Sequence, residues 1–360
     1  MQAANPYIFK TKPYVPGKPI DEVRRELGLK SVIKLASNEN PYPPSPKVLA
    51  AMARAAREVN RYPDGGCFIL RRGLARKFNV DDDQLLFGNG SDEIICLAVR
   101  AFAAKGGEVI IAKPSFLVYE IASILSGARL HQVPLQSFRY DLQAMRAKVN
   151  GRTRIIFIGN PDNPAGTYIT QRQAEDFLRS VPKNILVFFD EAYFEYVHAD
   201  DYPDTLGLMK KYPNLMVART FSKMYGLAGL RIGYGIARRD IIDILNRLRE
   251  PFNVNSMAQA AAAAVLADEP YYRKIAQEIH AQRLYLYRSL KAMNIAFEES
   301  FTNFILVRAG ADSSVIADAL LNKGVIVRDM AVWGLKGYIR TSIGTPAENK
   351  RFIKTLGEIL

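Results

Sequence analysis

Cysteine and histidine are scarce in this 360-residue sequence. The two cysteines, Cys67 and Cys96, are too few to form a disulfide framework. The three histidines, His131, His198 and His280, are scattered and lack the spacing of a metal-ligand cluster. We therefore expect a protein whose fold and chemistry depend on neither disulfide bonds nor a metal ion.

Long hydrophobic runs are also missing. The longest, ILVFF at 185–189 and the alanine-rich stretch 258–266, fall well short of the roughly 18 residues that a membrane-spanning helix requires. Residues 1–19 contain four prolines and lack the apolar core and cleavage site of a secretory signal. With 49% hydrophobic and 24% charged residues, the composition is that of one large or two modest globular domains. We expect a cytoplasmic protein without a membrane segment.

Positive charge is in excess: 49 Lys and Arg residues against 36 Asp and Glu residues give a net charge of +13. Such an excess favours either nucleic acid or anionic small molecules as partners. The basic residues are spread along the chain, and the sequence contains no zinc-finger, basic-zipper or RNA-binding signature. We therefore expect anionic small-molecule substrates and no nucleic-acid partner.

The pattern of the chain predicts three parts. Residues 1–46 are rich in Pro, Asn and Tyr and predict an arm that packs with a small C-terminal domain. From 47 to 255, short apolar runs alternate with helical patterns, which is typical of a mainly parallel sheet covered on both faces. Residues 256–360 begin with a long helical stretch, broken near Asp268, and continue as a smaller α+β unit. The expected strands of the large domain are 85–88, 108–112, 129–133, 154–159, 185–190, 215–219 and 232–237.

Lys223 and Asp190 lie at the carboxyl ends of two of these strands, where open α/β sheets bind ligands. A lysine at this edge can form a Schiff base with a carbonyl group. A carboxylate held there needs a cationic partner or several donors, and a protonated pyridine nitrogen is one such cation. Taken singly, the two residues are explained as well or better as a surface lysine in a loop and an aspartate that caps a strand end.

Asn163 and Tyr193 add hydrogen-bond donors at the same edge. Asn163 lies in the turn NPDNPAG (160–166), and Tyr193 comes three residues after Asp190. Together they can donate to a phenolate oxygen from two sides of a ring and so stabilise its anion. An ordinary turn would explain the prolines and Gly166, but not the remaining residues.

The loop GNGSDE (88–93) has the composition of an anion site. It precedes a predicted helix, so the backbone near Gly90 and the hydroxyl of Ser91 can approach an anion. Arg231, suited to bidentate phosphate contact, and Ser222 supply further polar groups. The alternative is an ordinary glycine loop in which Asp92 is a first-turn acid favoured by the helix dipole.

The motifs NPDNPAG, FDEAY (189–193) and SKMYGLAGLRIGY (222–234), in this order, resemble those of the fold-type I aminotransferases, which use pyridoxal 5'-phosphate. The resemblance spans nearly the whole chain, from KLASNENPYPPSP (34–46) to IRTSIGT (339–345). It implies an α/β fold with a mainly parallel seven-stranded sheet in a large domain, and a smaller α+β domain.

The resemblance also implies roles for the residues at the strand ends. Lys223 would form the Schiff base and act as general acid and base, Asp190 would hold the pyridine nitrogen, and Asn163 and Tyr193 would hold the ring oxygen. The region of the cofactor phosphate would be surrounded by Gly90, Ser91, Asp92, Ser222 and Arg231.

Two aromatic residues complete the implied cofactor site. Phe116 occupies a position where the family often has a tyrosine stacked on the ring, so stacking is kept and a hydroxyl contact is lost. Tyr62 of RYPDGG (61–66) would reach the phosphate of the neighbouring subunit. The implied assembly is a homodimer with shared active sites.

Within the family, the sequence is most similar to the histidinol-phosphate aminotransferases, through SNENPYPPSP (37–46), RYPDGG, VIVRD (325–329) and GYIRTSIG (337–344). This similarity implies amino transfer from L-histidinol phosphate to 2-oxoglutarate, in histidine biosynthesis. Tyr14, Asn163, Arg328 and Arg340 would bind the substrate, since two guanidinium groups suit a dianionic phosphate. For Arg328, an exposed arginine at a strand end is the alternative.

Three other activities stay open at this point. The nearest is an aminotransferase for aromatic amino acids, and a second is a decarboxylase that acts on threonine phosphate. A third is a non-catalytic module that keeps the fold for ligand sensing. Retention of Lys223, Asp190, Asn163 and Tyr193 argues against the third, because a binding module has no need of a Schiff-base lysine with all its partners.

Overall fold

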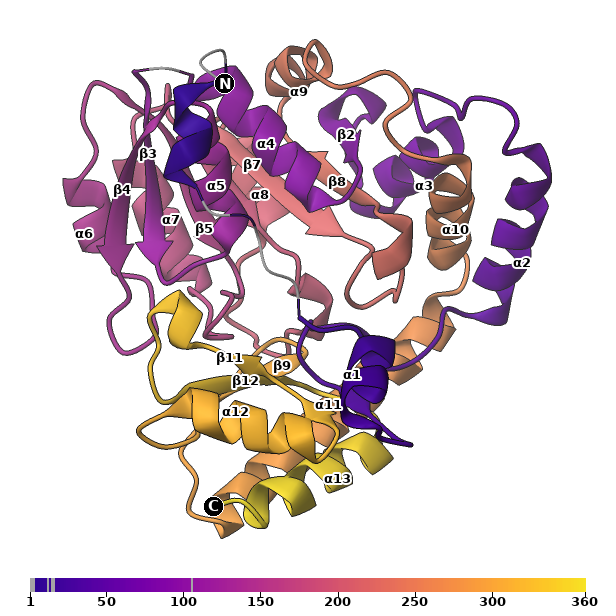
Figure 1. The fold of residues 1–360 in the computed structure, drawn as a ribbon. Coiled ribbons are helices and arrows are strands. Elements are labelled where there is room, and N and C mark those ends of the chain that lie inside the picture. Colours follow the sequence, from indigo (N-terminus) through magenta and orange to yellow (C-terminus); the bar gives the residue numbers. More distant parts are fainter. Residues whose placement is uncertain (1–3, 12, 14–16, 105) are drawn as a thin grey trace.

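A seven-stranded sheet forms the centre of the computed structural model, which describes residues 4–11, 13, 17–104 and 106–360 (Figure 1). Its strands run in the order β2-β8-β7-β6-β5-β3-β4, and only β8 is antiparallel to its neighbours. The predicted mainly parallel sheet is therefore confirmed. The strands are β2 (Leu85–Gly88), β3 (Glu108–Lys113), β4 (Arg129–Pro134), β5 (Thr153–Gly159), β6 (Leu186–Asp190), β7 (Leu215–Thr220) and β8 (Gly233–Ile236).

Helices cover both faces of this sheet. Because side chains alternate along a strand, Phe188 of β6 packs with α4, α5 and α9, whereas Phe189 packs with α7 and α8 on the other face. Both rings are fully buried, which explains why β6 is an unbroken apolar run. The helices around the large sheet are α4 (Ser91–Phe102), α5 (Leu117–Leu125), α6 (Leu142–Ala147), α7 (Gln171–Ser180), α8 (Thr205–Lys211) and α9 (Arg239–Asn246).

The C-terminal part of the chain forms a smaller unit, drawn in orange to yellow below the large sheet in Figure 1. Its antiparallel sheet has the order β11-β12-β9, formed by β11 (Arg328–Asp329), β12 (Tyr338–Ser342) and β9 (Phe304–Arg308). A second sheet joins β1 (Ile33–Lys34) to β10 (Val325–Ile326), so an N-terminal segment lies against the C-terminal unit. The helices of this unit are α11 (Glu269–Ala292), α12 (Ser313–Asn322) and α13 (Pro346–Gly357), and α1 (Ile20–Leu27) lies beside it.

Three helices flank the β2 side of the large sheet. They are α2 (Pro46–Ala55), α3 (Phe68–Phe78) and α10 (Ser256–Leu266), and α10 packs against the other two. The expected break in the long helical stretch is present, since α10 ends at Leu266 and α11 begins at Glu269. The alanine-rich stretch 258–266 is thus a helix packed closely on its neighbours.

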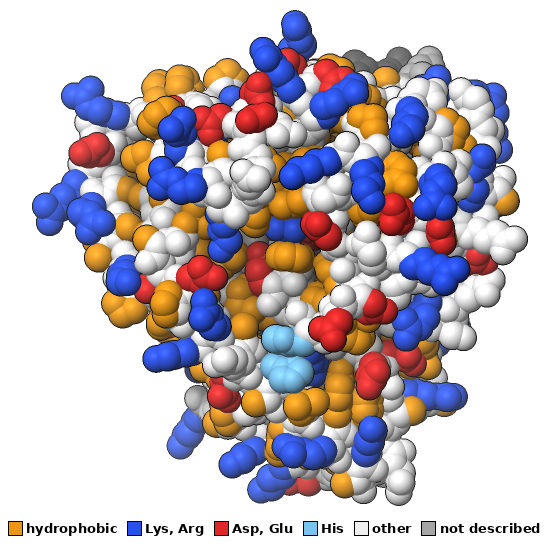
Figure 2. Space-filling model, turned by 180° about the vertical axis from the view of Figure 1, so that it is seen from behind, with side chains coloured by type: hydrophobic (Ala, Val, Ile, Leu, Met, Phe, Trp, Pro, Cys, Tyr) orange, Lys and Arg blue, Asp and Glu red, His pale blue; other side chains and the backbone are white. Residues whose placement is uncertain are grey.

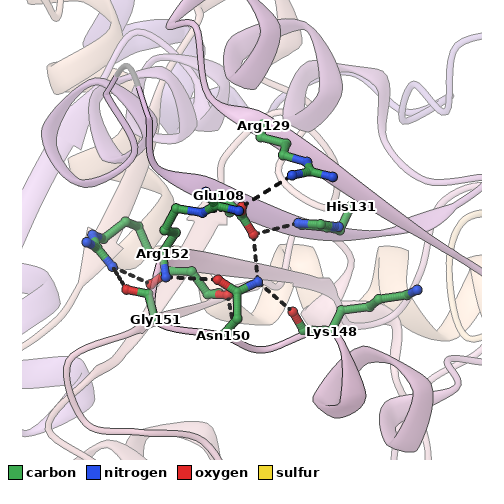
Figure 3. A network of polar contacts seen from close by, with 9 residues as sticks. Glu108, Arg129, His131, Lys148, Asn150, Gly151 and Arg152 are labelled. Atoms are coloured by element: carbon green, nitrogen blue, oxygen red, sulfur yellow. Dashed lines mark hydrogen bonds and ion pairs between the residues drawn. The ribbon is translucent and has the colours of Figure 1, made fainter.

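The amino edge of the large sheet carries a buried carboxylate, Glu108, whose side chain is 1% exposed (Figure 3). Its Oε2 accepts hydrogen bonds from Asn150 Nδ2 and His131 Nε2, both at 2.7 Å, and its Oε1 accepts one from Arg152 Nε at 2.9 Å. The hydrogen bonds from Asn150 and His131, together with the positive charge of Arg152, lower the pKa of Glu108 to about 2. The side chains around Glu108 therefore stabilise its charge.

Lys and Arg side chains are distributed over the whole face shown in Figure 2, with Asp and Glu side chains between them. This agrees with their even spacing along the sequence. The ring centroids of His198 and His280 lie 4.5 Å apart. In the described part of the chain, no helix is both long and apolar enough to cross a membrane.

Candidate active site

A cavity of about 540 Å³ lies at the carboxyl edge of the large sheet, where the loops after β5, β6 and β7 meet β11 and β12. Most of the residues singled out in the sequence line it, although they come from segments far apart in the chain. They are Ser91, Asp92, Phe116, Asn163, Asp190, Tyr193, Ser222, Lys223, Arg231, Arg328 and Arg340. Open α/β sheets bind ligands at this edge, as expected.

Three predicted site residues have other positions. Tyr14 lies outside the described residues, so its expected contact with substrate stays a prediction. Tyr62 is 82% exposed on the surface, with its ring stacked on that of Phe252 at 4.7 Å. Gly90 is not itself in the cavity wall but precedes Ser91 at the start of α4.

Lys223 follows β7 and reaches the cavity close to Tyr193, with its Nζ 5.7 Å from the centre of the tyrosine ring. Burial in the cavity wall and, second, the positive charge of Arg340 lower the pKa of Lys223 to about 8. A lysine with this pKa carries a much larger fraction of neutral amine near pH 7 than an exposed lysine. It is therefore suited to nucleophilic attack and proton transfer.

Asp190 ends β6 and is 5% exposed. Its carboxylate accepts a hydrogen bond from the Tyr119 hydroxyl at 2.8 Å and one from the backbone N–H of Ala192 at 3.1 Å. Both donors are neutral, so burial is the larger influence and raises the pKa of Asp190 to about 6. A cationic group of a ligand beside Asp190 would be strongly favoured.

Tyr193 is buried and its hydroxyl oxygen accepts two hydrogen bonds, from Asn38 Nδ2 at 2.9 Å and from Asn163 Nδ2 at 3.4 Å. The side chain of Arg340 donates to Oδ1 of Asn163. Asn163 and Tyr193 are thus adjacent, as the sequence indicated. Asn38 was not expected here, although it lies in the SNENP segment that supported the resemblance.

One corner of the cavity has the form of an anion site. The helix α4 begins at Ser91, and the guanidinium of Arg231 lies against its first turn, 3.4 Å from the Asp92 carboxylate. A side chain at Gly90, whose φ is +83°, would collide with that guanidinium, so glycine is required there. Ser222 completes the corner from the loop after β7.

Arg328 and Arg340 also line the cavity, and β11 and β12 place them as directly opposite partners in an antiparallel pair. Such cross-strand partners project from the same face of a sheet. Arg340 is 6% exposed, and its guanidinium lies over the rings of Phe304 and Trp333, at 5.1 and 5.5 Å from their centres. Two fixed cations facing one cavity favour a ligand with two negative charges.

Trp333 and Glu39 also line the cavity, and neither was singled out in the sequence. Trp333 lies in the short 3-10 helix η6 (Ala331–Trp333), which no strong periodicity marks. Glu39 is half-exposed and pairs with Lys34 at 3.2 Å. The motifs VIVRD and GYIRTSIG flank Trp333 in the chain and were the signals nearest to it.

The sequence matches a family model described as aminotransferase class I and II over residues 30–356. It is 46% identical to a histidinol-phosphate aminotransferase of Moorella thermoacetica over 355 residues, which cover 98% of this chain and 92% of the relative. It is 45% identical to histidinol-phosphate aminotransferase 2 of Carboxydothermus hydrogenoformans, with 97% of each chain covered.

Solved structures agree with the fold. Histidinol-phosphate aminotransferase from Sinorhizobium meliloti, in complex with pyridoxal-5'-phosphate, superimposes with a TM-score of 0.90 at 29% identity, covering 100% of this chain and 98% of that one. Aspartate aminotransferase from Thermus thermophilus, with maleate, has a TM-score of 0.87 at 20% identity and full coverage of both chains, which supports the fold alone. On the family model and the full-length relatives, this chain belongs to the class I and II aminotransferases.

Proposed function

We propose that this aminotransferase uses pyridoxal 5'-phosphate to transfer the amino group of L-histidinol phosphate to 2-oxoglutarate, giving imidazole acetol phosphate and L-glutamate. The observation that carries the proposal is the pair Arg328 and Arg340, which are cross-strand partners and line the same cavity as Lys223 and Asp190. A single carboxylate needs one guanidinium group, whereas the phosphate monoester at one end of this substrate can engage two.

The described residues fit the cofactor at each of its polar groups. Asp190, whose two hydrogen-bond donors are neutral, would face the pyridine nitrogen, and the Tyr193 hydroxyl would face the ring oxygen. Phe116 would stack on the ring. The phosphate would lie at the start of α4, held by Ser91, Ser222 and Arg231. When bound, pyridoxal 5'-phosphate supplies the electron sink that amino-acid carbanion chemistry requires.

Lys223 performs the proton transfers in this proposal. With a pKa near 8, its Nζ loses its proton easily enough to accept the proton of the substrate's amine-bearing carbon. In the return half-reaction Nζ would deliver a proton to the carbonyl carbon of 2-oxoglutarate, which receives the amino group and becomes the α-carbon of L-glutamate. Asp190 would be held ionised by the cofactor's cationic nitrogen, because two opposite unit charges about 4 Å apart attract by about 4 kcal/mol before desolvation at an effective dielectric constant near 20.

Arg340 and Arg328 bind and orient both substrates in turn. The phosphate of histidinol phosphate and the two carboxylates of 2-oxoglutarate each present two negative charges, so one arginine pair serves both half-reactions. The rings of Phe304 and Trp333 flank the Arg340 guanidinium and limit its movement. Asn163 links Arg340 to the cofactor side of the cavity, because it accepts a hydrogen bond from Arg340 and donates one to Tyr193.

The proposed enzyme is a cytoplasmic homodimer with shared active sites, in which Tyr62 reaches the cofactor phosphate of the neighbouring subunit. Exposed apolar side chains support the dimer: Phe252, which stacks on Tyr62, is 45% exposed, and Phe68 and Ile69 at the start of α3 are 64% and 76% exposed. Sedimentation of the holoenzyme tests the assembly. Mixing inactive Tyr62→Ala and Lys223→Ala subunits would restore part of the activity only if the sites are shared.

The substrate assignment is tested by single half-reactions of the purified holoenzyme. L-histidinol phosphate, L-phenylalanine and L-glutamate are added separately, and loss of the cofactor's visible absorbance band is followed. Histidinol phosphate is expected to react at least about a hundredfold more efficiently than phenylalanine, a transition-state difference of about 2.7 kcal/mol. Comparable rates would favour an aromatic aminotransferase instead. Release of carbon dioxide from threonine phosphate, without amino transfer, would contradict both assignments.

A further inference from the structure

Asn38 lies in the loop between β1 and α2 and is 2% exposed. Its φ of +54° belongs to the left-handed region, which asparagine and glycine adopt more readily than other residues. A buried polar side chain in this conformation is costly unless its hydrogen bonds compensate, so its contacts indicate what the conformation achieves.

The backbone of Asn38 is fixed to the small C-terminal unit. Its N–H donates to Oγ of Ser342 at 2.8 Å, and its carbonyl oxygen accepts from Nδ2 of Asn303 at 2.9 Å. Ser342 lies two residues after Arg340 on β12, and residues two apart on a strand share a face. The position of Asn38 is therefore set by the strand that carries the substrate-facing arginine.

The side chain of Asn38 is directed at Tyr193. Its Nδ2 donates to the Tyr193 hydroxyl oxygen at 2.9 Å, while its Oδ1 lies 3.5 Å from the Ser342 hydroxyl, which fixes the orientation of the amide. Asn163 donates to the same tyrosine oxygen at 3.4 Å. Two incoming donors occupy both lone pairs of the oxygen, so the tyrosine's own O–H is left to point elsewhere.

We propose that Asn38 is a positioning residue that directs the Tyr193 hydroxyl proton to the ring oxygen of the bound cofactor. This rests on the role of Tyr193 given under the proposed function. A hydroxyl that accepts a hydrogen bond becomes a stronger donor, because the two bonds polarise each other. A stronger donation stabilises the anion of the ring oxygen, and the bound cofactor then loses its titrating proton at a lower pH.

Other charged groups face Tyr193 and act on the same titration. They come from four different segments: Arg340 on β12, Lys223 after β7, Asp190 at the end of β6 and Asp162 in the turn after β5. All of them are retained when Asn38 is changed, so their contributions are common to the proteins compared below.

The test is a pH titration of the visible absorbance band of the holoenzyme. Asn38→Gly suits the positive φ, adds no charge and removes the amide, so the midpoint is expected to rise by about half a pH unit. Asn38→Asp also cannot donate when ionised and adds a negative charge, so its rise should be larger. Asn40→Ala is the matched control, since Asn40 anchors the same loop through Met224 without touching Tyr193. Its midpoint is expected to equal that of the unchanged protein.

Tyr193→Phe separates this inference from the proposed function. If Tyr193→Phe leaves the midpoint unchanged, the assignment of Tyr193 to the ring oxygen is wrong, and the inference falls with it. If Tyr193→Phe raises the midpoint and Asn38→Gly does not, only the inference about Asn38 is overturned. A rise seen with Asn38→Asp but not with Asn38→Gly would then be an effect of the added charge. We expect Asn38→Gly to raise the midpoint when it is the only substitution. In a protein that already carries Tyr193→Phe, adding Asn38→Gly should cause no further shift.

Discussion

Two buried carboxylates at opposite edges of one sheet have opposite environments. Glu108, at the start of β3, accepts from Asn150, His131 and Arg152, and its pKa is lowered to about 2 (Figure 3). Asp190, at the end of β6, accepts from the neutral Tyr119 hydroxyl and a backbone N–H, and its pKa is raised to about 6. The side chains around Glu108 compensate its charge, whereas the hydrogen-bond donors of Asp190 are neutral and burial disfavours its charge.

This difference distinguishes Glu108 from Asp190 without reference to motifs. A stabilised charge increases the stability of the fold, and a poorly compensated one reduces it until a ligand arrives. Lys223 is comparable, because burial and the positive charge of Arg340 lower its pKa by more than the carboxylates of Asp92 and Glu39 raise it. The carboxyl edge is therefore expected to be sensitive in activity, and the amino edge in stability.

The largest effect is expected for Lys223→Ala. Loss of the amine removes both the nucleophile and the proton carrier, so the half-reaction with histidinol phosphate should slow by at least about 10⁴-fold. Stopped-flow absorbance measures the rate, and circular dichroism checks the fold. Lys113→Ala serves as the control, since Lys113 pairs with Glu120 on the surface at 3.6 Å. Equal losses in both variants would contradict the assignment.

Asp190→Asn is expected to slow the same half-reaction by about 10² to 10³-fold, because the ion pair that keeps the pyridine nitrogen protonated is lost. The folded protein should be retained. A rate within about threefold of the unchanged enzyme would show that Asp190 does not face the cofactor's nitrogen.

The amino edge is tested by Glu108→Gln. Without the carboxylate, Asn150, His131 and Arg152 lose a charged acceptor, and the free energy of unfolding should fall by about 2 kcal/mol. Urea denaturation of the free protein measures the change. The half-reaction rate should stay within about twofold, since the affected residues lie at the far edge of the sheet. A large loss of activity with normal stability would remove the distinction between the two edges.

The pH dependence of stability should differ in sign between the two carboxylates. Glu108 has a lowered pKa, so its contribution is complete above about pH 5 and is lost as the pH falls toward 2. Asp190 has a raised pKa, so the free protein gains stability as the pH falls from about 6 to 4. Asp190→Asn should therefore stabilise the free protein by about 2 kcal/mol above pH 6 and have no effect near pH 4. Urea titrations at several pH values measure this, and a constant difference across the range would exclude it.

The strands and the cofactor side of the cavity could be predicted from the sequence because both depend on local signals. Buried parallel strands such as β6 are continuous apolar runs, and the polar residues that follow them meet at one edge of the sheet. Lys223, Asp190 and Asn163 are of this kind, and the structure brings all three into one cavity. The boundaries at residues 46 and 255 stay a prediction.

The contacts that depend on distant segments could not be predicted in this way. Asn38 meets Tyr193 across 155 positions of sequence, and its partner Ser342 is 304 positions away. The pairing of β1 with β10 involves two residues from each strand, too short for a periodic pattern. Trp333 likewise reaches the cavity only because η6 folds between β11 and β12.

The register of β11 and β12 has a consequence for how the enzyme could be redesigned. Arg328 and Arg340 share a face because they are partners in an antiparallel pair, with residues 330–337 connecting the two short strands. Substitutions in this connection would leave the two cations together. Adding or deleting one residue would favour a shift in pairing by one position, which turns one arginine to the other face. The length of this connection, more than its composition, therefore determines whether both positive charges are presented on one face to a substrate.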